Sequence, residues 1–517
     1  MIIYNEDPLN NPEKKTKKKK IIIIILSITI PILIIILIII LVLKLTQKKS
    51  KNNSEPSRID SLQSEEDIIH TYNFSTFFFF DPVTNLPCNQ KNYWTQFDNE
   101  TTCYRWISIT NHDINTSRTI KLMLDHNIAT STFNNYETVL IQKTKNWVRY
   151  KNNIDIIDEE TIFNLMQYNN YPDKSKKVIP SVIVNPFSSQ SYYIMKGKEI
   201  NEKGYWTKTS FDEDTAYAID YNGNNEVISK LEIYGIRPII NIEKKLLNTD
   251  SGVIDITHLI EKSHYIHFPV EDKLYDGFKY EVLQGFTVTN EKIFFMSSNN
   301  NNAEKGVLYS YLLDDLNNIY NTDYSNTGHG NGMTYNTKAG KVLTLGYYGV
   351  CEYNENTLIR EKDYNRPNYC GYSAIGYDYD MDLYIGRANH RIFFADTINM
   401  KKLYEFGVFM FEAGQDLEYY NGYIYDCATD FGLPNPYQKY SFYPGYELIY
   451  VYNAKFDENK KPTKNFGRLV ARFILKGFGE LESISFRNGN IYFGFGKNGY
   501  NFYYIDYNKF IEDAGVL

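Results

Sequence analysis

A strand–turn–strand pattern recurs five times in the C-terminal half of the chain, and this repeat limits the fold more than any other feature. The equivalent apolar positions are 49, 41, 41 and 67 residues apart. Repeats of about 40 to 50 residues built from alternating strands are typical of β-propeller blades. The last spacing is long because residues 431–446 contain three prolines and are interpreted as a loop insertion. The equivalent positions are Ile293, Val342, Leu383, Ile424 and Ile491.

This repeat predicts an all-β propeller of about five blades over residues 255–517, with a sixth blade if residues 255–277 complete one. The alternative is a β-sandwich or meander whose strands resemble one another by accident. Aromatic residues make up 16% of the chain, and aromatic side chains suit packed, half-buried sheets.

Residues 21–43 form a run of 23 uncharged residues, 14 of them isoleucine. A helix of this length spans about 35 Å, which exceeds the roughly 30 Å of a bilayer core. The run has no small-residue cleavage site of a signal peptide and no polar stripe of a buried core helix. We therefore expect a single transmembrane signal anchor over 21–43, a basic cytoplasmic tail over 1–20 and a stalk over 44–70.

The orientation of this anchor depends on a small difference in charge. Six lysines precede the run, five lysines and arginines follow it, and positive residues favour the cytoplasmic side. We expect a single-pass protein of the cell membrane, with a cytoplasmic N-terminus and extracellular C-terminal domains. A net charge of −7 and a pI near 5.8 argue against nucleic acid as a partner. The expected partners are the membrane and a carbohydrate or surface-protein ligand.

All four tryptophans of the chain lie in residues 75–245, which separates this segment from the repeats. Strand-like runs at 120–124 and 178–184 alternate with a helix expected at 158–168. In that helix an acidic first turn precedes apolar residues at helical spacing. The segment is therefore predicted to be an α+β domain.

Two short signatures occur late in this segment, Tyr205-Trp206-Thr207-Lys208-Thr209 and Gly235-Ile236-Arg237-Pro238-Ile239-Ile240. They resemble a domain of unknown function that is common in surface and secreted proteins of low-GC bacteria, here combined with a C-terminal β-propeller. The resemblance implies a C-type-lectin-like fold, similar also to that of formylglycine-generating enzymes. It transfers no site residue to this chain. Copper-dependent oxidase chemistry is not supported, because no cysteine pair lies near the second signature.

Five cysteines follow the apolar run. Cys88 and Cys103 flank one short aromatic segment, and Cys351 and Cys370 flank another. This spacing predicts two local disulfides outside the cytosol. The alternative is five unrelated buried thiols, and Cys427 has no assigned partner. No Cys-x-x-Cys spacing supports a zinc site.

The inner strand of each propeller blade lines the central channel, so polar residues at the strand starts should form a ring at one mouth. One member belongs to the segment 329–336, which resembles a stretch seen in several bacterial propeller proteins. We predict a ligand-binding site in this ring; the alternative is that the channel is polar because it is wet. The ring residues are Gln284, Asn331, Ser373, Gln415 and Glu482, and His329 and Asp416 are site residues beside the ring.

Three other motifs are interpreted as structural. Asp378, Asp380 and Asp382 alternate like calcium ligands, but the glycine of a calcium loop is missing, so we expect an acidic turn. Residues 494–499 match Gly-x-Gly-x-x-Gly, yet a strand-like run follows instead of a helix. The histidines in 258–267 lack zinc-protease spacing. The sequence predicts no catalytic residue, no metal site and no cofactor.

Taken together, these features favour a membrane-tethered extracellular binding or adhesion protein that recognises a glycan, a cell-wall polymer or a protein partner. Exposed aromatic side chains would stack on sugar rings or anchor a protein interface. The competing hypothesis is a membrane-anchored polysaccharide hydrolase or lyase with its site in the propeller channel. Binding is the stronger expectation, and catalysis stays undecided.

Overall fold

A computed structural model describes the chain from residue 77 to residue 516, with internal gaps. The expected tail, anchor and stalk (1–20, 21–43 and 44–70) lie outside the described residues. The longest internal gaps are 110–118, 169–176, 179–191, 195–203, 366–373 and 432–444.

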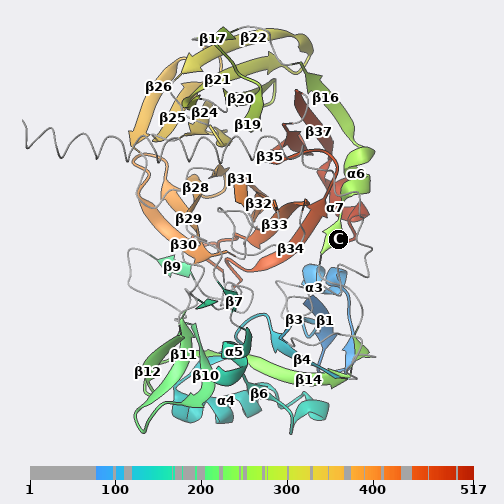
Figure 1. The fold of residues 1–517 in the computed structure, drawn as a ribbon, viewed down its shortest axis with the longest axis vertical. Coiled ribbons are helices and arrows are strands. Elements are labelled where there is room, and N and C mark those ends of the chain that lie inside the picture. The colour runs from blue at the N-terminus through green and yellow to red at the C-terminus, as the bar shows by residue number, and fades with distance from the viewer. Residues whose placement is uncertain are drawn as a thin grey trace, which may run out of the picture. The chain divides into compact units, whose positions relative to one another are not determined.

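Five sheets, three with four strands and two with five, make up the C-terminal part, and Figure 1 shows them arranged around a common centre. Within each sheet, strands adjacent in the chain pair antiparallel, and the innermost strands of the five sheets neighbour one another in a closed ring. This arrangement is a five-bladed β-propeller, so the predicted propeller is confirmed.

The blades have the following strands. Blade 1 contains β19 (Val282–Val288), β20 (Lys292–Asn299), β21 (Asn302–Leu312) and β22 (Asp315–Ser325). Blade 2 contains β23 (Gly332–Asn336), β24 (Lys341–Leu345), β25 (Gly349–Asn354) and β26 (Arg360–Asn365). Blade 3 contains β27 (Ile375–Asp378), β28 (Leu383–Ala388), β29 (Arg391–Asp396) and β30 (Lys402–Gly407), with β9 (Tyr192–Ile194) at its edge.

Blade 4 contains β31 (Ala413–Tyr420), β32 (Tyr423–Thr429), β33 (Glu447–Asn453) and β34 (Leu469–Leu475), with β15 (Ile254–Asp255) at its edge. Blade 5 contains β35 (Leu481–Arg487), β36 (Asn490–Phe495), β37 (Tyr500–Asp506) and β16 (His264–Phe268).

Tight turns join the first two strands of blades 4 and 5, which accounts for the strand–turn–strand pattern of the sequence there. Asn421 and Gly422 join β31 to β32, and Asn488 and Gly489 join β35 to β36. All four residues have positive φ angles, between 49° and 81°. Asn-Gly in this conformation forms the two-residue turn that matches the twist of a β-hairpin.

Glycines let the inner strands of neighbouring blades approach closely. A Cβ atom on Gly332 would lie 2.7 Å from the backbone nitrogen of Ile375 in blade 3. A Cβ atom on Gly376 would lie 2.8 Å from the side chain of Leu417 in blade 4. A larger residue at either position would push two blades apart.

The ring is closed by a strand that precedes blade 1. β16 pairs antiparallel with β37, with His264 opposite Tyr504 and Phe268 opposite Tyr500, and Figure 1 shows green β16 beside red β37. Residues 255–277 therefore complete blade 5 instead of forming a sixth blade. Phe268 is 1% exposed and contacts Phe295 of blade 1 as well as its own sheet.

Two sheets also dominate the N-terminal region, defined here as residues 77–247. The first has the order β2 (Leu86–Pro87), β1 (Phe77–Asp81), β3 (Tyr104–Ser108), β4 (Thr119–Leu124), β14 (Pro238–Glu243), β6 (Asp155–Ile156). The second has the order β12 (Asn225–Ser229), β11 (Thr215–Asp220), β10 (Gly204–Ser210), β13 (Tyr234–Ile236), β5 (Ala129–Ser131).

The helices of the described residues are short. They are α3 (Gln90–Gln96), α4 (Tyr136–Lys143), α5 (Glu159–Leu165), α6 (Thr257–Glu261), α7 (Tyr507–Asp513) and the 3-10 helices η2 (Phe133–Asn135) and η3 (Val148–Tyr150). Two small hairpins pair β7 (Gln167–Tyr168) with β8 (Lys177–Val178), and β17 (Leu274–Tyr275) with β18 (Phe278–Lys279).

The expected fold class, a transmembrane helix followed by an α+β domain and a propeller, is wrong as a whole. The structure is 56% strand and only 12% helical, because the N-terminal region is built on two sheets with short helices between their strands. The helix expected at 158–168 is the seven-residue α5. In the part of the chain that the structure describes, no helix has both the length and the apolar character to span a membrane.

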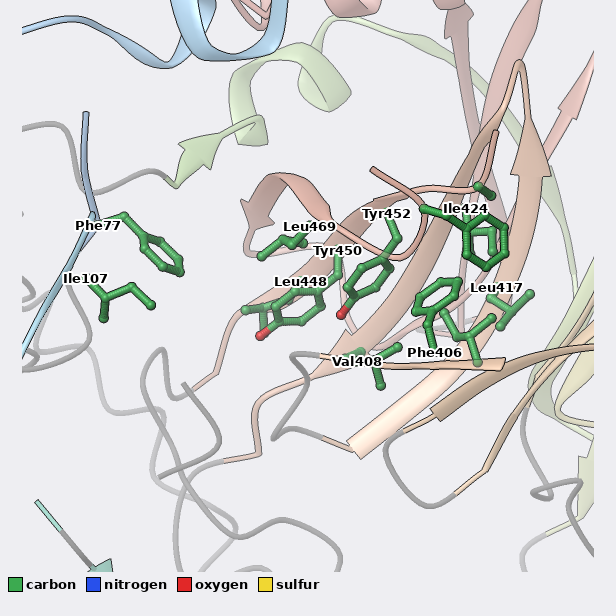
Figure 2. Close-up of a cluster of buried hydrophobic side chains, with 14 of the residues drawn as sticks. Phe77, Ile107, Phe406, Val408, Leu417, Ile424, Leu448, Tyr450, Tyr452 and Leu469 are labelled. Carbon is green, nitrogen blue, oxygen red and sulfur yellow. The ribbon is translucent and has the colours of Figure 1, made fainter. Parts of the chain in front are cut away.

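The N-terminal region and blade 4 share a buried apolar cluster within one compact unit, Glu65–Leu517. Phe77 and Ile107 belong to the same cluster as Leu448, Tyr450 and Leu469 (Figure 2). All five side chains are fully buried, so burial of apolar area stabilises this contact.

A buried charged cluster lies at the same junction. Asp125 Oδ2 accepts a hydrogen bond from Arg105 Nε at 2.8 Å, and Arg105 Nη2 donates to the Leu469 carbonyl at 2.5 Å. Arg468 Nη2 donates to the Tyr93 hydroxyl at 2.8 Å. Removing one partner from such a network leaves a buried charge without compensation, so this junction is specific as well as apolar.

Substitution of the closing strand tests the closure of the ring. We expect Phe268→Ala to lower the free energy of unfolding by about 3–5 kcal/mol, because it opens a cavity between blades 1 and 5. Denaturant titration measures the loss. Tyr265→Ala is the matched control on the same strand, since Tyr265 is 53% exposed, and it should cost less than about 1 kcal/mol. Equal losses from the two variants would contradict the closure.

Candidate functional site

The structure describes five of the seven predicted site residues. Gln284, Gln415 and Glu482 are buried near the starts of their inner strands, and Asn331 is half-buried just before β23. Gln415 Nε2 donates to Glu480 Oε1, and Gln284 Nε2 donates to the Leu283 carbonyl at 3.0 Å. His329 and Ser373 lie outside the described residues. Asp416 is the seventh member.

Asp416 is fully buried and joins four inner strands. Its Oδ1 accepts from the backbone N–H of Ile375 at 3.3 Å and of Leu417 at 2.8 Å. Its Oδ2 accepts from the Met333 N–H at 3.2 Å and from the Ser483 hydroxyl at 2.7 Å. These donors come from blades 2, 3, 4 and 5. The carboxylate that we predicted to face a ligand is therefore engaged in holding the propeller together.

Ser483 extends this network to blade 1, because its hydroxyl also lies 3.2 Å from the Phe286 carbonyl. Burial raises the pKa of Asp416 well above its usual range, and the hydrogen bonds from Ser483, Leu417 and Met333 oppose that rise.

Glu418 is a second carboxylate on the axis, and the sequence analysis missed it. Its Oε1 accepts from the N–H of Tyr377 at 3.2 Å and of Tyr419 at 3.0 Å, and its Oε2 accepts from the Thr334 hydroxyl at 2.8 Å. Side chains two residues apart on a strand share a face, so its position relative to Asp416 was the available signal. Burial raises the pKa of Glu418 to about 7.

A cavity of about 540 Å³ opens at the opposite mouth, where the inner strands end. Glu418 belongs to its lining, and residues from all five blades contribute. We call this cavity the tyrosine pocket. Its lining residues are Thr287, Val288, Tyr335, Thr337, Tyr377, Tyr379, Glu418, Tyr419, Tyr420, Ser485, Phe486, Arg487, Asn488 and Gly489. Its volume is in the range of ligand pockets.

The tyrosine rings of this pocket are fixed by their hydroxyl groups. Tyr377 donates to Asp382 Oδ1 at 2.8 Å, and Tyr419 donates to Asp380 Oδ2 at 2.6 Å. Tyr379 donates to an amide oxygen of the neighbouring turn at 3.2 Å. Because the hydroxyls are already engaged, the rings are pre-organised for contact with a ligand.

These contacts explain the acidic run from 378 to 382. Asp378 Oδ1 accepts from the N–H of Asp380 at 3.0 Å and of Met381 at 2.9 Å, as expected for the acidic turn. Within the described residues, no group of three His, Cys, Asp or Glu side chains is arranged to hold a metal ion.

The two signatures of the N-terminal region pack against each other. The guanidinium of Arg237 lies 5.2 Å from the ring centre of Tyr205, and both side chains are fully buried. Arg237 Nε donates to the Leu124 carbonyl at 2.6 Å. At Gly235 a Cβ atom would lie 1.9 Å from the side chain of Asn127. The signature residues therefore brace the two sheets.

The glycine motif lies at the junction of two strands of blade 5, and two of the three histidines lie on a strand of that blade, while His258 is on α6. Gly494 is within β36, and Gly499 directly precedes β37 with a φ angle of 111°. No helix follows the motif, so it lacks the element that would hold a phosphate. His264 and His267 lie on β16, and His267 Nδ1 is 3.0 Å from the Asn501 side chain.

One of the two predicted disulfides is confirmed. Cys88 and Cys103 are bonded, with Sγ atoms 2.01 Å apart. Cys351 is a free, buried thiol that packs with Met296 and Met333 between blades 1 and 2, so the second pairing is not formed in the structure. Cys370 lies outside the described residues. Burial raises the pKa of Cys351 to about 12.

Comparisons with known proteins add little to this description. No family model matches the chain, and no curated protein matches it. Among solved structures, BamB from Moraxella catarrhalis is similar over 57% of this chain and 70% of its own, at 10% identity and a TM-score of 0.22. The propeller assignment depends on the five blades themselves.

Substitution of the axial aspartate separates a structural role from ligand binding. In Asp416→Asn, an amide nitrogen replaces one carboxylate oxygen and faces an N–H donor. We expect the free energy of unfolding to fall by about 2–3 kcal/mol, the cost of unsatisfied buried groups. Chemical denaturation measures the change, with exposed Asp513→Asn as the control. An unchanged stability would contradict the structural role.

The buried carboxylates also predict how stability depends on pH. Burial raises the pKa of Glu418 from 4.5 to about 7 and that of Glu447 from 4.5 to about 8. The folded state then binds more protons than the unfolded state between these values, so stability falls as the pH rises from about 4.5 to 8. We expect a melting temperature at least about 5 °C higher at pH 5 than at pH 8. A melting temperature that rises with pH would contradict this assignment.

Proposed function

We propose that this protein is a binding protein whose β-propeller receives its ligand in the tyrosine pocket. The ligand is a group presented by a glycan, a cell-wall polymer or a protein partner. The observation that supports the proposal is the pocket itself, which combines six aromatic side chains with polar groups from five blades at the centre of a rigid ring. Fixed aromatic rings with a few placed polar groups are typical of binding sites.

The same pocket argues against hydrolysis. A glycosidase of the usual kind uses two carboxyl groups on either side of the scissile bond. Among the described residues, Glu418 is the only carboxylate in the lining, and both its oxygens already accept hydrogen bonds from the protein. The pKa of Glu418, about 7, is in the range of a general acid. A general acid must also reach the leaving group, whereas both oxygens of Glu418 are held by the protein.

We further propose that this is a protein of the cell membrane whose propeller lies outside the cell. The Cys88–Cys103 disulfide supports an oxidising compartment. The lysines before the apolar run support a cytoplasmic N-terminus.

The binding proposal is tested with the full-length chain in detergent. Binding to intact cells, to a glycan panel and to cell-wall polymer is compared with the release of reducing ends or unsaturated products. We expect binding without product, and about tenfold weaker binding for the double variant Tyr379→Ala/Tyr420→Ala, because two aromatic contacts are lost. Tyr265→Ala outside the pocket is the matched control.

Two results would overturn the proposal. One is product formation that disappears in Glu418→Gln, which would establish an enzyme. The other is binding that the pocket variants leave unchanged, which would move the site elsewhere.

A further inference from the structure

The tyrosine pocket contains a buried carboxylate without a cationic partner. Glu418 is 7% exposed, and its hydrogen-bond donors, Thr334, Tyr377 and Tyr419, are uncharged. Across the described residues, no lysine, arginine or histidine pairs with Glu418 or with Asp416. The two axial carboxyl groups lie two residues apart on one strand, so both face the same axis.

Some other buried carboxylates of this protein show the contrast, whereas Glu447 and Glu482, among the described residues, are buried without a basic partner as Glu418 is. At three places outside the axis, a guanidinium group lies within 2.8 Å of a largely buried carboxylate, which offsets the cost of taking the charge out of water. These pairs are Arg105–Asp125, Arg387–Asp426 and Arg391–Glu405.

The walls of the pocket also favour positive charge. Tyr419 and Tyr377 donate their hydroxyl protons to Asp380 and Asp382, and a phenol that donates to a carboxylate has a more electron-rich ring. Electron-rich aromatic faces attract cations. The carboxylates behind the rings add to the negative potential that a ligand meets.

Arg487 is the one basic residue that the structure describes in the lining, and it is held at the rim. Its Nε donates to Asn290 Oδ1 at 2.7 Å, and its guanidinium lies 5.5 Å from the centre of the Tyr335 ring. These contacts keep Arg487 on the wall of the pocket and away from a pairing with Glu418.

We propose, on the basis of the binding function above, that the ligand of the tyrosine pocket presents an alkylammonium group that lies among the tyrosine rings and faces Glu418. A quaternary ammonium headgroup, a lysine side chain and an amino sugar share this chemistry. An anionic sugar or a phosphate is repelled by the same groups.

The state of Glu418 gives this proposal a pH dependence. Burial raises its pKa to about 7, and a bound cation favours the ionised form. The titratable and charged groups that face it are Asp416 on its own strand, Tyr377 and Tyr419, and Arg487 from blade 5 at the rim. Ligand affinity should therefore fall when the pH is lowered from 8 to 5.5.

Matched small probes test the charge of the ligand on the full-length chain. Glucosamine carries an amino group that is acetylated in N-acetylglucosamine. Choline carries a permanent positive charge. Nα-acetyl-lysine methylamide, whose side-chain ammonium group is free, represents a lysine of a protein. We expect calorimetry at pH 8 to show glucosamine, choline or the lysine amide binding at least tenfold more tightly than N-acetylglucosamine or glucuronate. The tightest of the three identifies the source of the ammonium group.

The variants assign the binding to the pocket. Glu418→Gln keeps each hydrogen bond, since its oxygen accepts both N–H groups and its nitrogen donates to Thr334. It should weaken choline binding about tenfold at pH 8 and abolish the pH dependence. Tyr379→Ala should weaken choline binding about fivefold, while Tyr265→Ala should not change it. If Glu418→Gln does not fold, the pH dependence of the unsubstituted chain and the Tyr379→Ala result decide the question.

The cationic ligand would be overturned if none of glucosamine, choline and the lysine amide binds more tightly than N-acetylglucosamine, or if pH leaves the binding of the tightest of the three unchanged. Either result leaves the binding function standing if the pocket variants still weaken attachment to cells or polymers. Loss of that effect would instead overturn the proposed function.

Discussion

The hydrogen bonds of Asp416 hold the centre of this protein together. In a five-bladed ring the inner strands converge on an axis, and their polar groups near that axis are shielded from water. One carboxylate supplies acceptors for donors from blades 2, 3, 4 and 5, and Ser483 continues the network to blade 1. The glycines at 332 and 376 allow the close approach that these bonds require. Because the axis is occupied at this level, a ligand has to bind at a mouth of the ring.

The tyrosine pocket is a consequence of the same geometry one level further along the strands. Glu418 lies two residues after Asp416 on the same face of the strand, so the axial hydrogen-bond network forms the bottom of the pocket. The rings above it belong to strands that Asp416 and Glu418 already fix in register. Pre-organisation of this kind lowers the entropic cost of binding, and it ties ligand recognition to the stability of the propeller.

The blades could be predicted from the sequence because each one repeats a local pattern of strand, turn and strand, with Asn-Gly at two of the turns. Asp416 could be predicted as a site residue because the starts of the inner strands occupy equivalent places in the five blades. The sequence could not show which mouth of the ring is open. One mouth is closed by the bonds that the backbone N–H groups of Met333 and Ile375 donate to Asp416, and no sequence pattern reveals these bonds. The tyrosine pocket could not be predicted either, because its lining residues, from Thr287 to Gly489, come together only in the folded ring. The helical share of the N-terminal region was overestimated, because a single seven-residue helix produced the strongest local signal.

The closing strand has a consequence for how the chain is made. The partners His264 and Tyr504 are separated by almost the whole propeller, so during synthesis β16 emerges long before β37 exists. Until then, β16 lacks its partner strand, and unpaired strand edges are prone to pair with other chains. A ribosome that stops before residue 500 would release an open, adhesive arc instead of a shorter propeller. Full-length synthesis is therefore a condition for solubility of the domain as well as for its binding site.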